Sequence, residues 1–106
     1  MTLPEVTDAT FDAEVLESAD PVLVDFTAAW CPPCRVMKPV LAELADEVPN
    51  LRVVQVDTDV HKDSAIRYEV LAMPTFVLFR AGTPVLRLVG ARPKSRLRAE
   101  VESALS

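Results

Sequence analysis

Two cysteines separated by two prolines are the feature that most constrains this chain. They lie in the segment Trp30-Cys31-Pro32-Pro33-Cys34, shortly after Val22-Leu23-Val24-Asp25-Phe26, a run with the length and apolar character of a buried strand. A disulfide across this spacing closes so small a ring that it removes little entropy from the unfolded chain. Because Cys-x-x-Cys beside a βαβ pattern is typical of redox sites, the pair indicates thiol–disulfide chemistry rather than a structural cross-link.

Hydrophobic periodicity predicts an α/β protein with a single domain over residues 1–106, a length that buries about two thirds of the unfolded surface. Strands are expected at 22–26, 51–57, 75–79 and 84–89. Helices are expected near Phe11, from the cysteine motif to about 48, and at 64–68 and 94–105. Asp8 and Asp63 are expected to cap the first and third helices, and Val36 to lie in the apolar stripe of the second. This order predicts a central mixed β-sheet with helices on both faces.

A helix that begins at the cysteines would make the two thiols chemically different. Cys31, at its amino end, lies where free N–H groups and the helix dipole favour the thiolate that attacks disulfides. Cys34, one turn further, is expected to be shielded and to resolve the mixed disulfide that Cys31 forms. A structural zinc site needs four ligands, and the two cysteines with His61 cannot supply them within one molecule. An inert buried cysteine pair is the other alternative.

Asp25 interrupts an otherwise apolar strand six residues before Cys31. An unpaired carboxylate is costly to bury, and burial raises its pKa. We therefore expect Asp25 to accept the proton of Cys34 when the mixed disulfide is resolved. The alternative is a solvated carboxylate at a sheet edge.

Other positions near the motif leave structural alternatives open. Met73-Pro74 opens a strand, and a cis bond there would turn the Met73 backbone outward to pair with an extended peptide, although only about 5–6% of X–Pro bonds are cis. Trp30 is either an exposed docking ring or a half-buried packing residue. Gly82 fits a hairpin turn that needs a positive φ. Gly90, at a strand end, indicates a bulge or a close backbone approach.

The charge of the chain argues against two classes of partner. The net charge of −5 disfavours nucleic acid and anionic membrane surfaces. Residues 1–50 contain ten acidic and two basic residues, whereas residues 51–106 contain six acidic and nine basic ones. This asymmetry indicates either two differently solvated faces or a docking surface for a charged partner. No basic start followed by an apolar run is visible, so we expect a reducing, cytoplasmic location.

Along essentially its whole length the chain resembles the thioredoxin family. The matching segments, in order, are Val-Asp-Phe at 24–26, Trp-Cys-Pro-Pro-Cys at 30–34, Pro39, Val-Asp-Thr-Asp at 56–59, Met-Pro-Thr at 73–75, Phe-Arg-Ala-Gly at 79–82 and Val-Gly-Ala at 89–91. The resemblance implies the thioredoxin fold, with a cis bond before Pro74. It also implies a monomeric protein-disulfide reductase without a bound cofactor or metal.

The same resemblance implies roles for individual residues. Cys31 would be the nucleophile, Cys34 the resolving thiol and Asp25 the buried acid. Trp30, Met73, Pro74 and Gly90 would line the groove that binds a segment of an oxidised target protein. Electrons would come from NADPH through a flavin-containing thioredoxin reductase.

Three positions depart from the commonest family pattern. Pro32 replaces a glycine, which removes one N–H near the Cys31 sulfur. Gln55 stands where many bacterial thioredoxins have a buried lysine, so Asp25 is expected to lack that charge partner. Thr27 stands where another tryptophan is often found.

Two further functions are compatible with the sequence. The dipeptide between the cysteines sets the redox poise, so the protein could instead be an oxidase or isomerase. A thioredoxin-fold module with a purely structural or binding role is the third possibility. The combination of Cys31, Cys34 and Asp25 favours the reductase.

Overall fold

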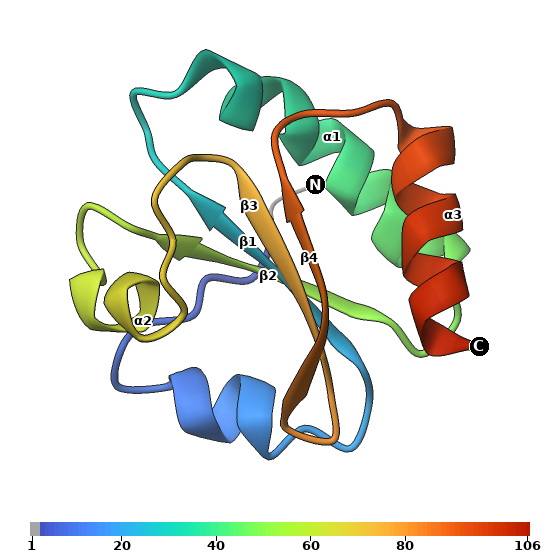
Figure 1. Ribbon diagram of the computed structural model, residues 1–106, viewed down its shortest axis with the longest axis horizontal. Coiled ribbons are helices and arrows are strands. Elements are labelled where there is room, and N and C mark those ends of the chain that lie inside the picture. The colour runs from blue at the N-terminus through green and yellow to red at the C-terminus, as the bar shows by residue number, and fades with distance from the viewer. Residues whose placement is uncertain (1–2) are drawn as a thin grey trace.

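Four strands form one sheet in the order β2-β1-β3-β4 in the computed structural model, which describes residues 3–106. The strands are β1 (Val22–Thr27), β2 (Arg52–Asp57), β3 (Thr75–Arg80) and β4 (Thr83–Val89). β1 is parallel to β2 and antiparallel to β3, and β3 and β4 form an antiparallel hairpin. The sheet is therefore mixed, as the sequence predicts, and occupies the centre of the molecule (Figure 1).

Helices cover both faces of the sheet. They are η1 (Asp12–Leu16), a short helix with one wide turn, α1 (Pro32–Glu47), α2 (Lys62–Arg67) and α3 (Lys94–Leu105). α1 and α3 lie on one face, and η1 and α2 on the other (Figure 1). The predicted order of elements is confirmed, with ends that differ by at most two residues for β1, β2, α2, β3 and β4.

Side chains along β1 point alternately to the two faces of the sheet, and the core accordingly consists of two clusters. Leu23 packs in the cluster that includes Met37 of α1 and Leu97 of α3. Val24 packs in the other cluster, which includes Phe11 beside η1. Because successive side chains of a strand point to opposite faces, Asp25 lies on the same face as Leu23, beneath α1.

Both predicted helix caps are wrong. η1 follows Phe11 and has no side-chain cap, and α2 begins at Lys62 without a cap from its own segment. Instead, the Asp8 carboxylate accepts the N–H groups of Asp63 and Ser64 at 3.3 and 2.8 Å, and the Ser64 hydroxyl at 2.6 Å. Asp8 therefore caps α2 across more than fifty residues, a contact that a local cap pattern does not predict.

The prediction that Val36 lies in the buried apolar stripe of the second helix is also wrong. Its side chain is 65% exposed, whereas Met37, Leu41 and Leu44 of the same helix are buried. Positions 37, 41 and 44 form a narrow stripe at helical spacing, and Val36 lies one residue, about 100°, to its side.

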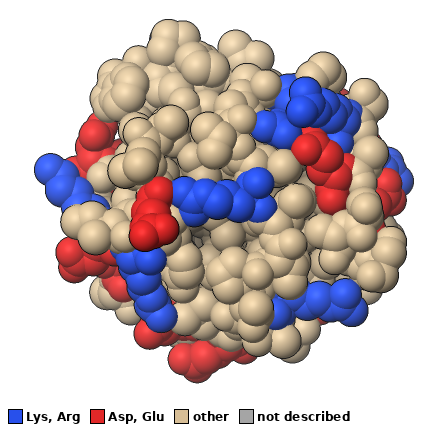
Figure 2. All heavy atoms as spheres, in the orientation of Figure 1, with Lys and Arg blue, Asp and Glu red and all other residues tan. Residues whose placement is uncertain are grey.

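Ion pairs between the two halves of the chain offset part of their charge asymmetry. Lys94 and Arg98 of α3 pair with Glu47 of α1 at 2.6 and 2.9 Å, and Lys94 also pairs with Glu43 at 3.3 Å. Basic and acidic side chains lie beside one another over α3 in Figure 2. The acidic half thus supplies α1 and the basic half supplies the helix that packs against it.

Candidate active site

The disulfide between Cys31 and Cys34 lies at the start of α1, with the two Cα atoms 5.3 Å apart. Cys31 is the residue that caps the helix, and its sulfur accepts the backbone N–H of Cys34 at 3.3 Å. Pro32 and Pro33 occupy the first helical positions and have no N–H. The N–H of Cys34 is therefore the first that the helix offers to the Cys31 sulfur.

Both cysteines are buried in this oxidised form. Cys31 is 2% exposed and Cys34 is 1% exposed. The predicted shielding of Cys34 is confirmed, and Cys31 differs from it by its place at the helix end. Trp30 is 62% exposed, which agrees with an exposed ring and not with a half-buried packing residue.

Met73 and Pro74 lie against the disulfide. Their peptide bond is cis, as the family resemblance implies. The carbonyl oxygen of Met73 is 3.6 Å from the sulfur of Cys31. The N–H of Gly90 donates to the carbonyl of Pro74 at 2.9 Å. The fold thus brings Met73, Pro74 and Gly90 together from segments that follow Cys31 by some 40 to 60 residues.

The conformation of Gly90 explains why a glycine stands there. Its φ is +97°, a region that other residues rarely adopt, and a Cβ atom built on it would have no neighbour within 4 Å. The backbone of Pro74 approaches Gly90 through the hydrogen bond to its N–H, but no part of the described chain occupies the space where a Cβ atom would lie, so the glycine is not required by crowding. The register shift of the hairpin lies at Leu78 and Phe79, so Gly90 does not form a bulge. Gly82 has a φ of +79°, which confirms the predicted turn.

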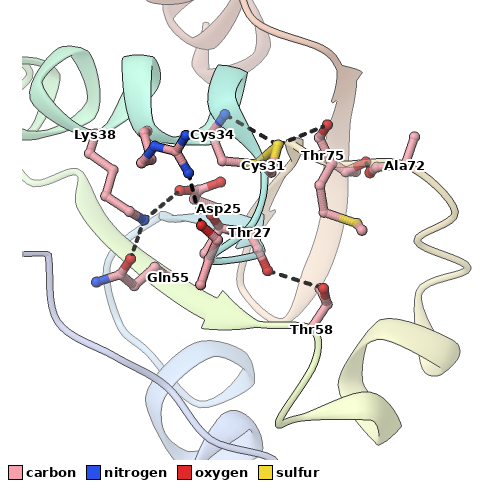
Figure 3. The surroundings of a disulfide bond; sticks show 12 residues. Asp25, Thr27, Cys31, Cys34, Lys38, Gln55, Thr58, Ala72 and Thr75 are labelled. Carbon is pink, nitrogen blue, oxygen red and sulfur yellow. Dashed lines mark hydrogen bonds and ion pairs between the residues drawn. A yellow bond between two sulfur atoms is a disulfide. The ribbon is translucent and has the colours of Figure 1, made fainter.

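Asp25 is fully buried beneath the first turns of α1. In the sheet its register partners are Gln55 on β2 and Phe76 on β3, so the alternative of a solvated edge carboxylate is wrong. Burial raises the pKa of Asp25 from 3.8 to about 7, and the charge of Lys38 opposes this rise. Figure 3 shows Asp25 with Lys38 on one side and the disulfide on the other.

The expectation that Asp25 lacks a cationic partner is wrong. The Nζ of Lys38 lies 4.0 Å from Oδ2 of Asp25 and donates a hydrogen bond of 2.6 Å to Oε1 of Gln55. The cation comes from α1 rather than from β2. Its position four residues after Cys34, on the same face of a helix, is a sequence signal that could have found it.

Neither a metal site nor a membrane-crossing helix is found in the part of the chain that the structure describes. Residues 3–106 contain no group of three or more His, Cys, Asp or Glu side chains that could hold a metal ion. None of the helices within the same range is long and apolar enough to cross a membrane.

The mixed sheet and the Cys-x-x-Cys disulfide at the start of α1 define a thiol–disulfide oxidoreductase. The family model described as Thioredoxin matches residues 2–103. The thioredoxin of Mycolicibacterium smegmatis is 46% identical over 103 residues, which cover 94% of this chain and 92% of the relative. The thioredoxin of Mycobacterium bovis is 44% identical over 102 residues, covering 95% and 88%. The chain belongs to the thioredoxin family.

A third relative combines two activities in its name. The bifunctional thioredoxin reductase/thioredoxin of Mycobacterium leprae is 50% identical over 94 residues. The match covers 88% of this chain but only 20% of that longer protein.

Proposed function

We propose that the protein reduces disulfides of target proteins with Cys31 as the nucleophile, Cys34 as the resolving thiol and Asp25 as the proton acceptor. The observation that carries this proposal is the asymmetry of the disulfide. The Cys31 sulfur faces the first N–H of α1, whereas Cys34 lies within the helix, and both Cys34 and the Asp25 carboxylate on β1 are buried. A helix N-terminus favours a thiolate, and an acid with a pKa near neutrality suits proton transfer at cellular pH.

A target segment would bind across the surface formed by Trp30, Met73, Pro74 and Gly90. Trp30 offers an exposed ring, and the open space beside Gly90 leaves room for a second backbone. The Met73 carbonyl, 3.6 Å from the Cys31 sulfur, lies where a bound strand would bring its cysteine. Partners are thus recognised mainly through backbone and apolar contacts.

A flavin-containing thioredoxin reductase that uses NADPH would return the Cys31–Cys34 disulfide to the dithiol form. The protein itself would carry electrons without a bound cofactor. The relative named for both a reductase and a thioredoxin supports such a pairing. The protein would act as a monomeric, single-domain electron carrier in the cytoplasm and contribute to cell redox homeostasis.

The decisive experiment is NADPH-coupled reduction of insulin disulfides with a mycobacterial thioredoxin reductase. We expect turnover for the wild type, none for Cys31→Ser, and a trapped mixed disulfide for Cys34→Ser that mass spectrometry detects. The exposed Thr83→Ser variant serves as the control. Absence of turnover with any reductase tested would refute the reductase function.

The reduction potential measured against glutathione separates a reductase from an oxidase. A potential near that of protein disulfide isomerase, about −180 mV, would favour the oxidase or isomerase function. Full biological function of a Cys31→Ser/Cys34→Ser double variant would favour the structural module.

A further inference from the structure

Arg92, in the connection between β4 and α3, is a buried arginine whose three side-chain nitrogens all donate hydrogen bonds. Its side chain is 8% exposed, against 39% for Arg98 in the helix that follows. Nη2 donates to the Val89 carbonyl at 2.8 Å, Nε donates to the Gly90 carbonyl at 3.3 Å, and Nη1 donates to the two carboxylate oxygens of Glu100 at 3.0 and 2.9 Å. A charge is costly to bury unless it is paired and hydrogen-bonded. These contacts offset that cost for Arg92.

The two carbonyl groups that Arg92 binds belong to the surface beside the disulfide. Val89 is the last residue of β4, and its register partner is Thr75 at the start of β3. The N–H of Gly90 donates to the Pro74 carbonyl at 2.9 Å. The side chain of Val89 is exposed, and the space beside Gly90 is open. Arg92 thus holds the turn that lies directly beside the cis bond before Pro74.

Glu100 connects this turn to an element that is fixed in the core. It lies in α3, whose side chains Leu97 and Val101 are buried in the cluster between this helix, α1 and the sheet. The Nε of Arg96 lies 3.5 Å from Oε1 of Glu100, so a second cation helps to orient the carboxylate. Figure 1 shows the connection that leaves β4 and enters α3. The turn after β4 is therefore tied to α3 through Glu100 and Arg92.

A turn that contains glycine needs such a restraint if another chain is to bind to it. Gly90 has a φ of +97°, and glycine adopts positive and negative φ about equally readily. Ordering a free turn on binding lowers the affinity, because the lost conformational entropy opposes association. A turn that is already held in the bound conformation avoids this loss.

We propose that Arg92 is a positioning residue for the docking of target proteins, and that Glu100 holds it in place. The guanidinium group fixes the Val89 and Gly90 carbonyls, and with them the shape of the surface on which a target backbone would bind. This inference rests on the proposed function, since it deepens the role of the surface around Gly90. Arg92 takes no part in bond exchange at Cys31. It therefore matters for an extended protein segment and not for a small disulfide that reaches Cys31 without that surface.

The test measures how fast the reduced protein reacts with insulin and with a small aromatic disulfide, in the absence of any reductase. The fluorescence of Trp30, the single tryptophan, follows the first reaction, and release of the aromatic thiol follows the second. Arg92→Met keeps an unbranched side chain without its donors. We expect the second-order rate constant for insulin to fall about tenfold and that for the small disulfide to stay the same. Equal rate constants for insulin in Arg92→Met and wild type would overturn the proposal.

Arg98→Met is the matched control. Arg98 donates to Glu47 at 2.9 Å and to Glu102 at 3.2 Å, so the same substitution removes an ion-paired arginine of α3 without touching the turn after β4. It should leave both rate constants unchanged. If Arg98→Met slows the reaction with insulin as much as Arg92→Met does, the effect comes from a loosened α3 and the role of Arg92 is contradicted.

Glu100→Gln keeps the proposal testable if Arg92→Met does not fold. It retains the shape of the side chain and removes its charge, and it should also slow the reaction with insulin alone. An unchanged rate constant for insulin in Glu100→Gln would overturn the proposal by itself. If Glu100 acts through Arg92, the double variant should be no slower than Arg92→Met, because residues of one network are not additive. Losses that multiply in the double variant would contradict the link between the two residues.

The variant Cys31→Ser separates failure of this inference from failure of the proposed function. If the wild type reduces the small disulfide but not insulin, or if Cys31→Ser still reduces insulin, the proposed function fails. If only Cys31→Ser is inactive, while Arg92→Met and Glu100→Gln react with insulin as fast as the wild type, the positioning role of Arg92 alone fails.

Discussion

The backbone N–H of Cys34 points at the sulfur of Cys31 across 3.3 Å. In a helix cap the side chain of the capping residue accepts from the second or third N–H group. Pro33 removes the second here, so Cys34 supplies the only such donor. The sulfur that we propose as the nucleophile therefore depends on its own redox partner for its hydrogen bond.

Replacing Pro32 by glycine should change both the redox potential and the stability. The new N–H adds a partial positive charge near the Cys31 sulfur, which favours the thiolate and makes the potential more positive. The freer unfolded chain should lower the free energy of unfolding by about 1 kcal/mol. Glutathione equilibration and urea unfolding measure the two effects. Pro93→Gly, before α3, is the control and should alter stability only; an unchanged potential in Pro32→Gly would exclude tuning by Pro32.

Asp25 should make the folded protein less stable as the pH rises. The pKa of its carboxyl group is 3.8 as a model value and about 7 in the fold, so between these values the folded state retains a proton that the unfolded state has lost. The free energy of unfolding should fall by up to about 4 kcal/mol between about pH 4 and pH 7. Urea unfolding of wild type and Asp25→Asn over this range measures the difference. Parallel pH curves for the two proteins would contradict the raised pKa.

Loss of the Asp8 carboxylate should loosen α2. Asp8→Ala leaves the N–H groups of Asp63 and Ser64 without their acceptor, so their amide hydrogens should exchange faster and the protein should unfold at a lower temperature. The hydrogen bond from the Ser64 hydroxyl lowers the pKa of Asp8. The ionised Asp8 carboxylate therefore contributes to the free energy of unfolding above the unfolded pKa of about 3.8. This contribution is lost as the pH falls further. Unaltered exchange at Asp63 and Ser64 would show that the cap is dispensable.

Gly90→Ala should impair the reduction of protein targets more than that of small disulfides. The positive φ makes the substitution destabilising by about 1–2 kcal/mol, and the added methyl group projects into space that a target backbone would use. Insulin reduction compared with reduction of a small aromatic disulfide tests this difference. Gly82→Ala, also at positive φ but next to Leu16, should lose stability without discriminating between substrates. Equal losses with both substrates in Gly90→Ala would argue against a docking role.

The ion pairs between α1 and α3 should contribute little to stability. Glu47→Gln removes the partner shared by Lys94 and Arg98, but these side chains are partly exposed and such pairs are weak. The expected decrease in melting temperature is small and should disappear at high salt, since salt screens exposed charges. A large decrease that persists at high salt would indicate that Glu47 stabilises the fold in another way.

The sequence by itself determined the order of the elements, the site of the disulfide and the burial of Asp25. These features are local: strand and helix periods, the spacing of Cys31 and Cys34, and a single carboxylate within an apolar run all act over a few neighbouring residues. The resemblance to the thioredoxin family added the cis bond before Pro74, which the residue statistics alone disfavour.

Only the tertiary structure decided which residues lie around the buried acid and which cap α2. Lys38 reaches Asp25 because α1 crosses the face of β1, and Asp8 reaches Ser64 because the segment before η1 runs past α2. Contacts between residues so far apart in the chain depend on how whole elements pack, and no short pattern encodes that packing. The pair of cysteines is thus evident from the sequence, whereas the surroundings of Asp25 that would govern its proton are a property of the assembled fold.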